Sequence, residues 1–127
     1  MDETKTILVA VSDIFFYTKI RDAFLPSGYK LARLRNSEDW LEKVLNSQPI
    51  GMIVNMNDDR LNTPNILKAL KASPQTQSLP ILAFANHEEV GSWKLAKELG
   101  IQKVVSRNEF SARALALFEE LSTSTTS

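Results

Sequence analysis

The stretch Gly51-Met52-Ile53-Val54-Asn55-Met56-Asn57-Asp58-Asp59 decides how the rest of this sequence is interpreted. Its four leading apolar residues lie between Pro49 and a polar segment, a pattern that predicts a strand buried on both faces. Other apolar runs flank it at helix-length intervals, so we predict the central strand of a parallel sheet. Ligands of open α/β sheets bind at the carboxyl ends of the strands. Asn55, at that end, is therefore the residue to explain.

The composition excludes several classes of protein. A chain of 127 residues with 43% hydrophobic residues predicts one domain with a full core. The fifteen basic and fifteen acidic residues cancel, which argues against a nucleic-acid partner. The absence of cysteine excludes disulfides, thiolate metal sites and thiol catalysis. A single histidine, His87, disfavours a histidine-based metal site or triad.

The sequence carries no signal for secretion or for a membrane. The opening residues Met1 to Lys5 lack the basic and apolar segments of a signal peptide. No apolar stretch approaches the ~20 residues that span a bilayer. We therefore expect a cytoplasmic protein that does not bind membranes.

Apolar runs and helical stripes alternate along the chain. Strands are predicted at 6–11, 29–34, 51–55, 80–85 and 101–105, and helices over 14–25, from 36, from 63, over 88–99 and around 110–121. Right-handed crossovers place such helices on both faces of a parallel sheet. We predict one domain over residues 1–122. The Ser/Thr-rich residues 123–127 have nothing to bury and are expected to form a disordered tail.

In this spacing the chain resembles a response-regulator receiver domain, from Lys5 to Leu121. The matching intervals run from the first strand to Gly28-Tyr29, from Asn55 to Leu70, and through the segments 79–81 and 98–101. The resemblance implies a flavodoxin-like (βα)5 three-layer sandwich with a five-stranded parallel sheet. It also implies a role in bacterial two-component signal transduction.

The residues that carry receiver chemistry are replaced here. Receivers hold Mg²⁺ with two acidic residues after the first strand, attack a phosphoryl group with an aspartate after the third, and contact the product through a hydroxyl and a lysine. The resemblance places the acidic pair on Val11 and Ser12 and the phosphoryl acceptor on Asn55. It places the hydroxyl on Ala85, the lysine on Arg107 and an aromatic switch position on Val104. An alignment shifted by one residue puts Ser12 and Asp13 on the acidic pair, which restores one carboxylate.

The substitutions imply a pocket of degenerate chemistry. An amide is neither a useful nucleophile nor a Mg²⁺ ligand of full charge. We therefore expect no phosphorylation of Asn55, no tight metal site and no cofactor. Arg107 is expected to hydrogen-bond Asn55 or nearby carbonyls, with anion binding as the alternative. The peptide bond from Arg107 to Asn108 is expected to be trans, because a non-proline cis bond costs ~3 kcal/mol.

We therefore predict a pseudo-receiver, which is not an enzyme and acts by binding another protein. The expected partner is a signalling protein or an output domain. The receiver face of the fourth helix, fifth strand and fifth helix also allows a weak homodimer, and it would comprise Val90, Trp93, Lys94, Lys97, Val104 and Arg113. The rival function is a phosphorelay receiver whose acceptor is Asp58 or Asp59, although both are expected to be solvated turn residues. Phe15 and Tyr17 form an alternative docking patch if both are exposed.

Overall fold

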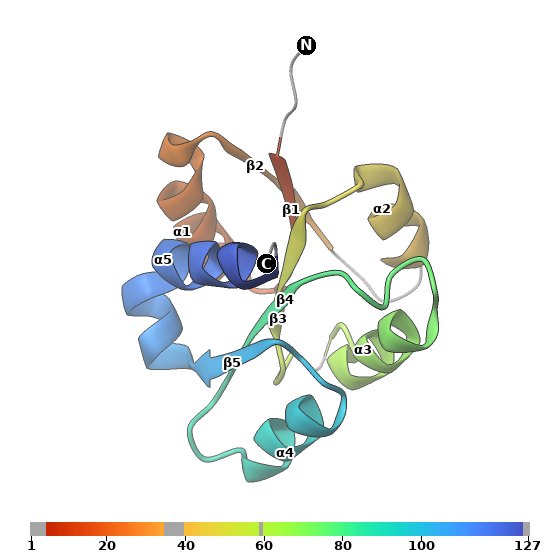
Figure 1. The fold of residues 1–127 in the computed structure, drawn as a ribbon. Coiled ribbons are helices and arrows are strands. Elements are labelled where there is room, and N and C mark those ends of the chain that lie inside the picture. The colour runs from red at the N-terminus through yellow and green to blue at the C-terminus, as the bar shows by residue number, and fades with distance from the viewer. Residues whose placement is uncertain (1–4, 35–39, 59, 126–127) are drawn as a thin grey trace.

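The computed structural model describes the backbone of residues 5–34, 40–58 and 60–125, with side chains as far as Leu121. Strands and helices alternate along it (Figure 1). The strands are β1 (Lys5–Ala10), β2 (Tyr29–Arg33), β3 (Gly51–Asn55), β4 (Ile81–Ala85) and β5 (Lys103–Ser106). The helices are α1 (Ile14–Phe24), the 3-10 turn η1 (Leu25–Ser27), α2 (Trp40–Ser47), α3 (Thr63–Ala72), α4 (Val90–Glu98) and α5 (Arg107–Thr125).

The five strands form one parallel sheet in the order β2-β1-β3-β4-β5. Helices α1 and α5 cover one face, and α2, α3 and α4 cover the other (Figure 1). The predicted flavodoxin-like (βα)5 three-layer sandwich is therefore confirmed, with β3 as its central strand. No helix in the described ranges has both the length and the hydropathy to cross a membrane.

Alternate strand residues build two separate cores. Toward α2, α3 and α4, buried strand residues meet Val44, Ile66, Leu67, Leu70 and Ala96. Toward α1 and α5, the core is rich in phenylalanine. Phe84 stacks on Phe110 with ring centroids 4.5 Å apart, and Phe118 packs edge-on against Phe24 at 5.8 Å. These two cores fix the strand ends on which the candidate site is built.

Several element boundaries differ from the predicted ones for local reasons. Helix α4 begins at Val90 rather than at residue 88, because Glu89 still belongs to the preceding turn, in which its N–H donates to the Asn86 carbonyl. Strand β5 begins at Lys103 rather than at residue 101. Gly100 turns the chain with φ 72°, and Gln102 then accepts a hydrogen bond from the Ile81 N–H.

The last helix starts earlier and runs further than its apolar stripe suggests. It follows β5 directly, is bent where Arg113 leaves helical geometry (φ −137°, ψ 29°), and reaches Thr125. Helical backbone therefore extends into the segment 123–127, whose assignment as a disordered tail stays a prediction. No cis peptide bond occurs in the described part of the chain, which confirms the trans bond after Arg107.

Candidate functional site

The carboxyl edge of the sheet collects the predicted pocket residues from four adjacent strands. Ala10 of β1 pairs with Val54 of β3. The residues that follow these two, Val11 and Asn55, therefore lie side by side at this edge. Asn55 pairs with Phe84, and Ala85 pairs with Ser106, the residue before Arg107. Val11 and Ala85 are fully buried and bring no polar side chain to this edge.

Asn55 uses its side chain to shape its own loop. Its Oδ1 accepts a hydrogen bond from the Asn57 backbone N–H at 3.0 Å, and its carbonyl accepts one from the Thr63 hydroxyl at 2.8 Å. A side-chain oxygen bonded two residues ahead is the arrangement by which asparagine stabilises a turn. The amide that replaces the expected carboxylate therefore orders the β3–α3 loop.

Asp58 is buried, and the expectation of a solvated turn residue was wrong for it. Only 6% of the residue is exposed. Its Oδ2 accepts a hydrogen bond from the Ser12 N–H at 2.6 Å, and its Oδ1 accepts from the Ser12 hydroxyl at 2.9 Å and from the Leu61 N–H at 3.2 Å. Burial of a carboxylate is tolerable when donors surround it in this way. Asp58 therefore ties the β3–α3 loop to the end of β1. Asp59 lies outside the described residues.

The two candidate residues after β1 have separate structural roles. Ser12 binds Asp58 through both its N–H and its hydroxyl. Asp13 is the N-cap of α1, with Oδ1 accepting from Phe15 N–H at 2.9 Å and Phe16 N–H at 3.3 Å. The carboxylate that a shifted alignment would restore is therefore engaged at a helix start, as N-cap aspartates are.

Arg33, at the end of β2, is a site residue that the sequence reasoning missed. Its Nη2 donates to the Ser12 carbonyl at 2.6 Å, and its guanidinium lies 5.7 Å from the centre of the Tyr17 ring. Its position as the last residue of a neighbouring strand could have marked it as facing this edge. It supplies a positive charge beside the β1–α1 turn.

Arg107 was predicted to hydrogen-bond Asn55 or nearby carbonyls, and among the described residues it makes neither bond. Its guanidinium carbon lies 4.3 Å from the centre of the Phe16 ring and 6.0 Å from that of Phe84. A planar guanidinium on an aromatic face is a favourable cation–π contact. The aromatic core on the α1–α5 side offers such a surface, which explains why the side chain takes that direction.

The described residues provide no cluster of three acidic or histidine side chains that could hold a metal ion. What the edge offers instead is an amide, Asn55, and a buried carboxylate, Asp58, both engaged by backbone donors. This arrangement can stabilise loops. It does not present converging ionised oxygens to a cation among the residues described.

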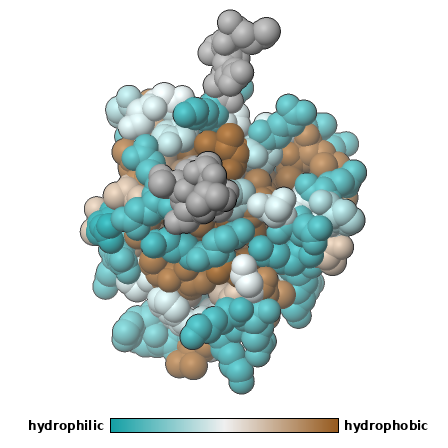
Figure 2. Space-filling view, viewed as in Figure 1, coloured by the Kyte–Doolittle hydropathy of each residue, from teal (hydrophilic) through white to brown (hydrophobic). Residues whose placement is uncertain are grey.

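The predicted partner face contains both apolar and charged groups. Val90 is 73% exposed, and Figure 2 shows hydrophobic colour interrupting a largely hydrophilic surface over the start of α4. Lys94 and Lys97 are exposed, whereas Trp93 and Val104 are half-buried. The face therefore combines one prominent apolar side chain with two solvated lysines.

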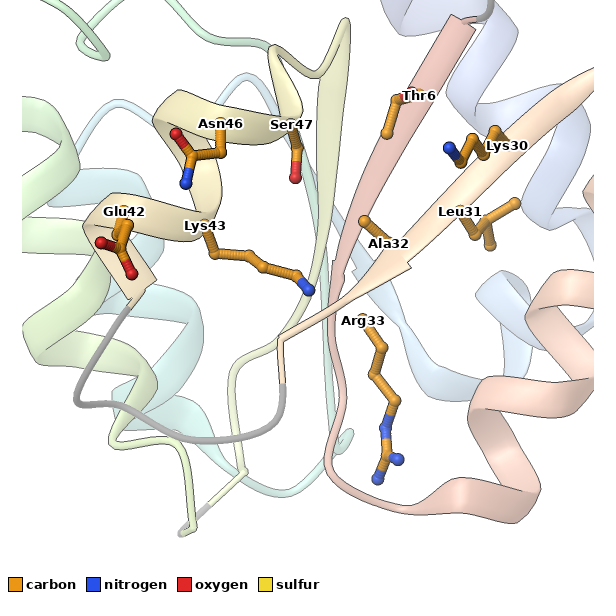
Figure 3. Close-up of a pocket in the computed structure, with 9 residues that line it drawn as sticks. All are labelled: Thr6, Lys30, Leu31, Ala32, Arg33, Glu42, Lys43, Asn46 and Ser47. Atoms are coloured by element: carbon orange, nitrogen blue, oxygen red, sulfur yellow. The ribbon is translucent and has the colours of Figure 1, made fainter.

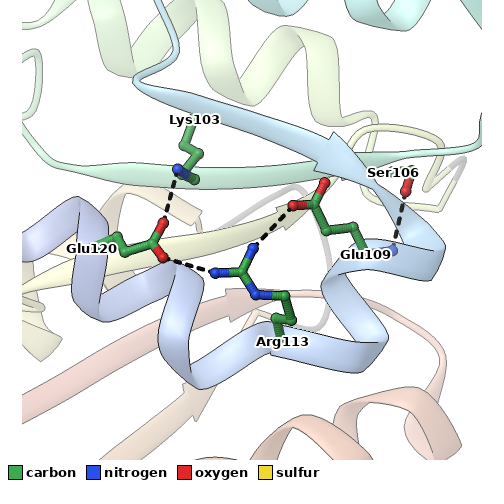
Figure 4. Close-up of polar contacts among 5 residues, drawn as sticks. All are labelled: Lys103, Ser106, Glu109, Arg113 and Glu120. Carbon is green, nitrogen blue, oxygen red and sulfur yellow. Dashed lines mark hydrogen bonds and ion pairs between the residues drawn. The ribbon is translucent and has the colours of Figure 1, made fainter.

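Arg113 is not a free cation on that face. It donates to Glu109 at 3.3 Å and to Glu120 at 2.8 Å, and Lys103 donates to the other oxygen of Glu120 at 3.1 Å (Figure 4). These exposed ion pairs span the bend in α5. Because each partner already has an opposite charge, Arg113 offers less to an acidic partner than the exposed lysines do.

Glu120 gives this network a measurable signature. The hydrogen bond from Lys103, followed by the positive charges of Lys103 and Arg113, lowers the pKa of the Glu120 carboxyl. A lowered folded-state pKa means that the pairing stabilises the fold above the ordinary carboxyl pKa, and that this stabilisation is lost as the pH falls through the folded-state pKa.

We expect Lys103→Gln to raise the pKa of Glu120 in an NMR titration, and Lys68→Gln, on α3, to leave it unchanged. Equal pKa values in all three proteins would contradict this.

Two further surface features involve Arg33: the aromatic pair Phe15 and Tyr17, and a groove that Arg33 helps to line. Phe15 is 82% exposed, but Tyr17 is half-buried beneath Arg33, so the two do not form one exposed patch. A groove of about 770 Å³ lies between β2 and α2, with Lys43 reaching across it and Glu42 turned away (Figure 3). None of the predicted pocket residues lines this groove.

Comparison with known proteins identifies the fold. No protein-family model matches the sequence, and no curated protein is significantly similar to it. Solved structures do match along nearly the whole chain. The chemotaxis response regulator CheY4 of Vibrio cholerae has a TM-score of 0.80 at 14% identity, covering 94% of this chain and 99% of its own.

Two further structures agree. A CheY-like response-regulator receiver domain protein from Methanospirillum hungatei has a TM-score of 0.81 at 14% identity, covering 98% of both chains. The receiver domain of a signal transduction histidine kinase from Syntrophus aciditrophicus has a TM-score of 0.83 at 12% identity, covering 95% of this chain and 92% of its own. At such identities, the likeness establishes a receiver-type fold.

Proposed function

We propose that this chain is a phosphorylation-independent pseudo-receiver, a cytoplasmic module of bacterial two-component signalling that acts by binding another protein. The single observation that carries the proposal is the use of the Asn55 amide oxygen in a turn, where receiver chemistry needs an ionised nucleophile. The match in fold to response regulators and to a kinase receiver domain supports the signalling context. The partner is a signalling protein or an output domain.

The surroundings of Asn55 support the same proposal. Val11 and Ala85 are buried and apolar where receivers carry a metal ligand and a hydroxyl. Arg107, in the lysine position, lies on the Phe16 ring. A module of this kind keeps the receiver shape, and therefore its docking faces, while its edge residues serve the fold.

The rival proposal is a phosphorelay receiver with Asp58 or Asp59 as acceptor. At Asp58 the geometry opposes it, because both carboxylate oxygens already accept hydrogen bonds and the residue is buried. An acceptor oxygen must approach a phosphodonor in line. Phosphorylation there would first require the Ser12 and Leu61 contacts to break.

Partner capture tests the docking proposal. We expect immobilised wild-type protein to retain the same partner with and without a small phosphodonor and Mg²⁺. We expect Val90→Asp to lose that partner, because it places a charge on the most exposed apolar residue of the face. The variant should fold, since aspartate is favourable in the first turn of a helix.

Asn65→Asp, which likewise replaces a neutral side chain with aspartate on the exposed surface of α3, is the matched control and should retain the partner. Retention that depends on the phosphodonor would favour the phosphorelay receiver. If Val90→Asp retained the partner as well as wild type does, the partner would not bind at the α4 face. The proposal that binding is independent of phosphorylation would be unaffected.

A further inference from the structure

Helix α4 has few apolar anchors in its first half. Of its nine residues, Val90–Glu98, only Ala96 is fully buried. Glu89, which precedes the helix, makes no side-chain capping hydrogen bond. Val90 points to solvent, and Trp93 is half-buried against the core on this side of the sheet. Polar contacts therefore add to this one large apolar contact in positioning the first half of the helix.

Asn57 supplies those contacts from the β3–α3 loop. Its Nδ2 donates to the Ser92 hydroxyl at 2.8 Å, and its Oδ1 accepts from the Asn86 N–H at 2.8 Å. One amide thus bonds both α4 and the β4–α4 loop. A neutral amide has a donor and an acceptor side, and here each side has a partner.

The bonds continue in both directions from Asn57. The Asn86 carbonyl accepts from the Trp93 indole Nε1 at 3.0 Å, and the Asn57 N–H donates to Asn55 Oδ1 at 3.0 Å. An unbroken chain of hydrogen bonds therefore joins the end of β3, the β4–α4 loop and the face of α4.

We propose that Asn57 is a conformational latch that holds the first half of α4 and the Trp93 indole in one orientation. Release of the latch frees this half of the helix while the two cores of the sheet stay packed. The latch joins Asn55 to α4 through polar bonds that need neither a phosphoryl group nor a metal. The latch proposal does not depend on whether the α4 face binds the partner proposed above.

Hydrogen exchange measured by NMR tests the latch in the full chain. In Asn57→Ala, we expect the exchange of the Trp93 indole N–H and of the amides of residues 92–94 to rise about tenfold, as the loss of two modest hydrogen bonds allows. Amides of β3 and α3 should keep wild-type rates. The Trp40 indole, on α2, serves as the internal reference.

Two further variants separate a latch from a general contribution to stability. Asn57→Asp offers two acceptor oxygens to the Asn86 N–H and the Ser92 hydroxyl, so it should stay within about twofold of wild type. Asn46→Ala, at an exposed position of α2, should change nothing at Trp93. Unchanged exchange in Asn57→Ala, or an equal rise over the whole protein, would overturn the latch.

Discussion

Asp58→Ala should lower the free energy of unfolding by roughly 2–4 kcal/mol, since truncation removes a carboxyl group that accepts three hydrogen bonds and leaves one buried and two part-buried donors unpaired. Three donors lose their partner together: the N–H and hydroxyl of Ser12 and the N–H of Leu61. Leu61 is fully buried, so its N–H cannot turn to water without local opening. Urea unfolding followed by circular dichroism measures the change.

An exposed aspartate provides the matched control. Asp22 pairs with Arg21 at 3.8 Å on the surface of α1, and exposed pairs contribute little to stability. Asp22→Ala should therefore stay within about 0.5 kcal/mol of wild type. If Asp58→Ala were as mild as Asp22→Ala, the carboxylate would not be the link between β1 and the β3–α3 loop.

Gly51→Ala should cost about 2 kcal/mol through overpacking, and it is the second large effect that we expect. A Cβ at Gly51 would lie 2.6 Å from Cζ and 2.7 Å from Cε1 of Phe118. That ring is buried between α5 and the sheet and packs against Phe24, so it has little room to move. Glycine at the start of β3 is thus required by the close approach of α5.

Denaturant unfolding of two variants tests whether the contact with the Phe118 ring is the cause. Gly91→Ala adds a Cβ that meets nothing within 4 Å, and its stability should equal wild type or exceed it by up to about 0.5 kcal/mol. In a Phe118→Leu background, which removes the obstructing ring atoms, Gly51→Ala should cost less than in wild type. Additive costs, or a harmless Gly51→Ala, would contradict the packing argument.

The fold could be predicted because its signals are local. The runs 7–11, 51–54 and 80–85 are continuously apolar, which strands buried on both faces require. Their separation by amphipathic helices leaves few topologies. The register brings Asn55 to the same sheet edge as the residues after β1, β4 and β5, as the spacing indicated, with β1 and β4 as the strands next to its own.

The side-chain contacts of the edge could not be predicted in the same way. The polar run around Asp58 has the composition of a solvated loop, and its burial depends on Ser12, 46 positions away in the sequence. Arg107 is long enough to reach either Asn55 or the aromatic core. Its direction follows from the packing of Phe16 against Phe84, which joins α1 to β4.

The most direct measurement is the intact mass of the protein after incubation with a small phosphodonor and Mg²⁺. The account predicts that wild type and Asp58→Asn both keep their unmodified mass, with a known receiver domain phosphorylated in parallel as the positive control. A gain of one phosphoryl group by the wild-type protein would contradict it, and the loss of that gain in Asp58→Asn would identify Asp58 as the acceptor.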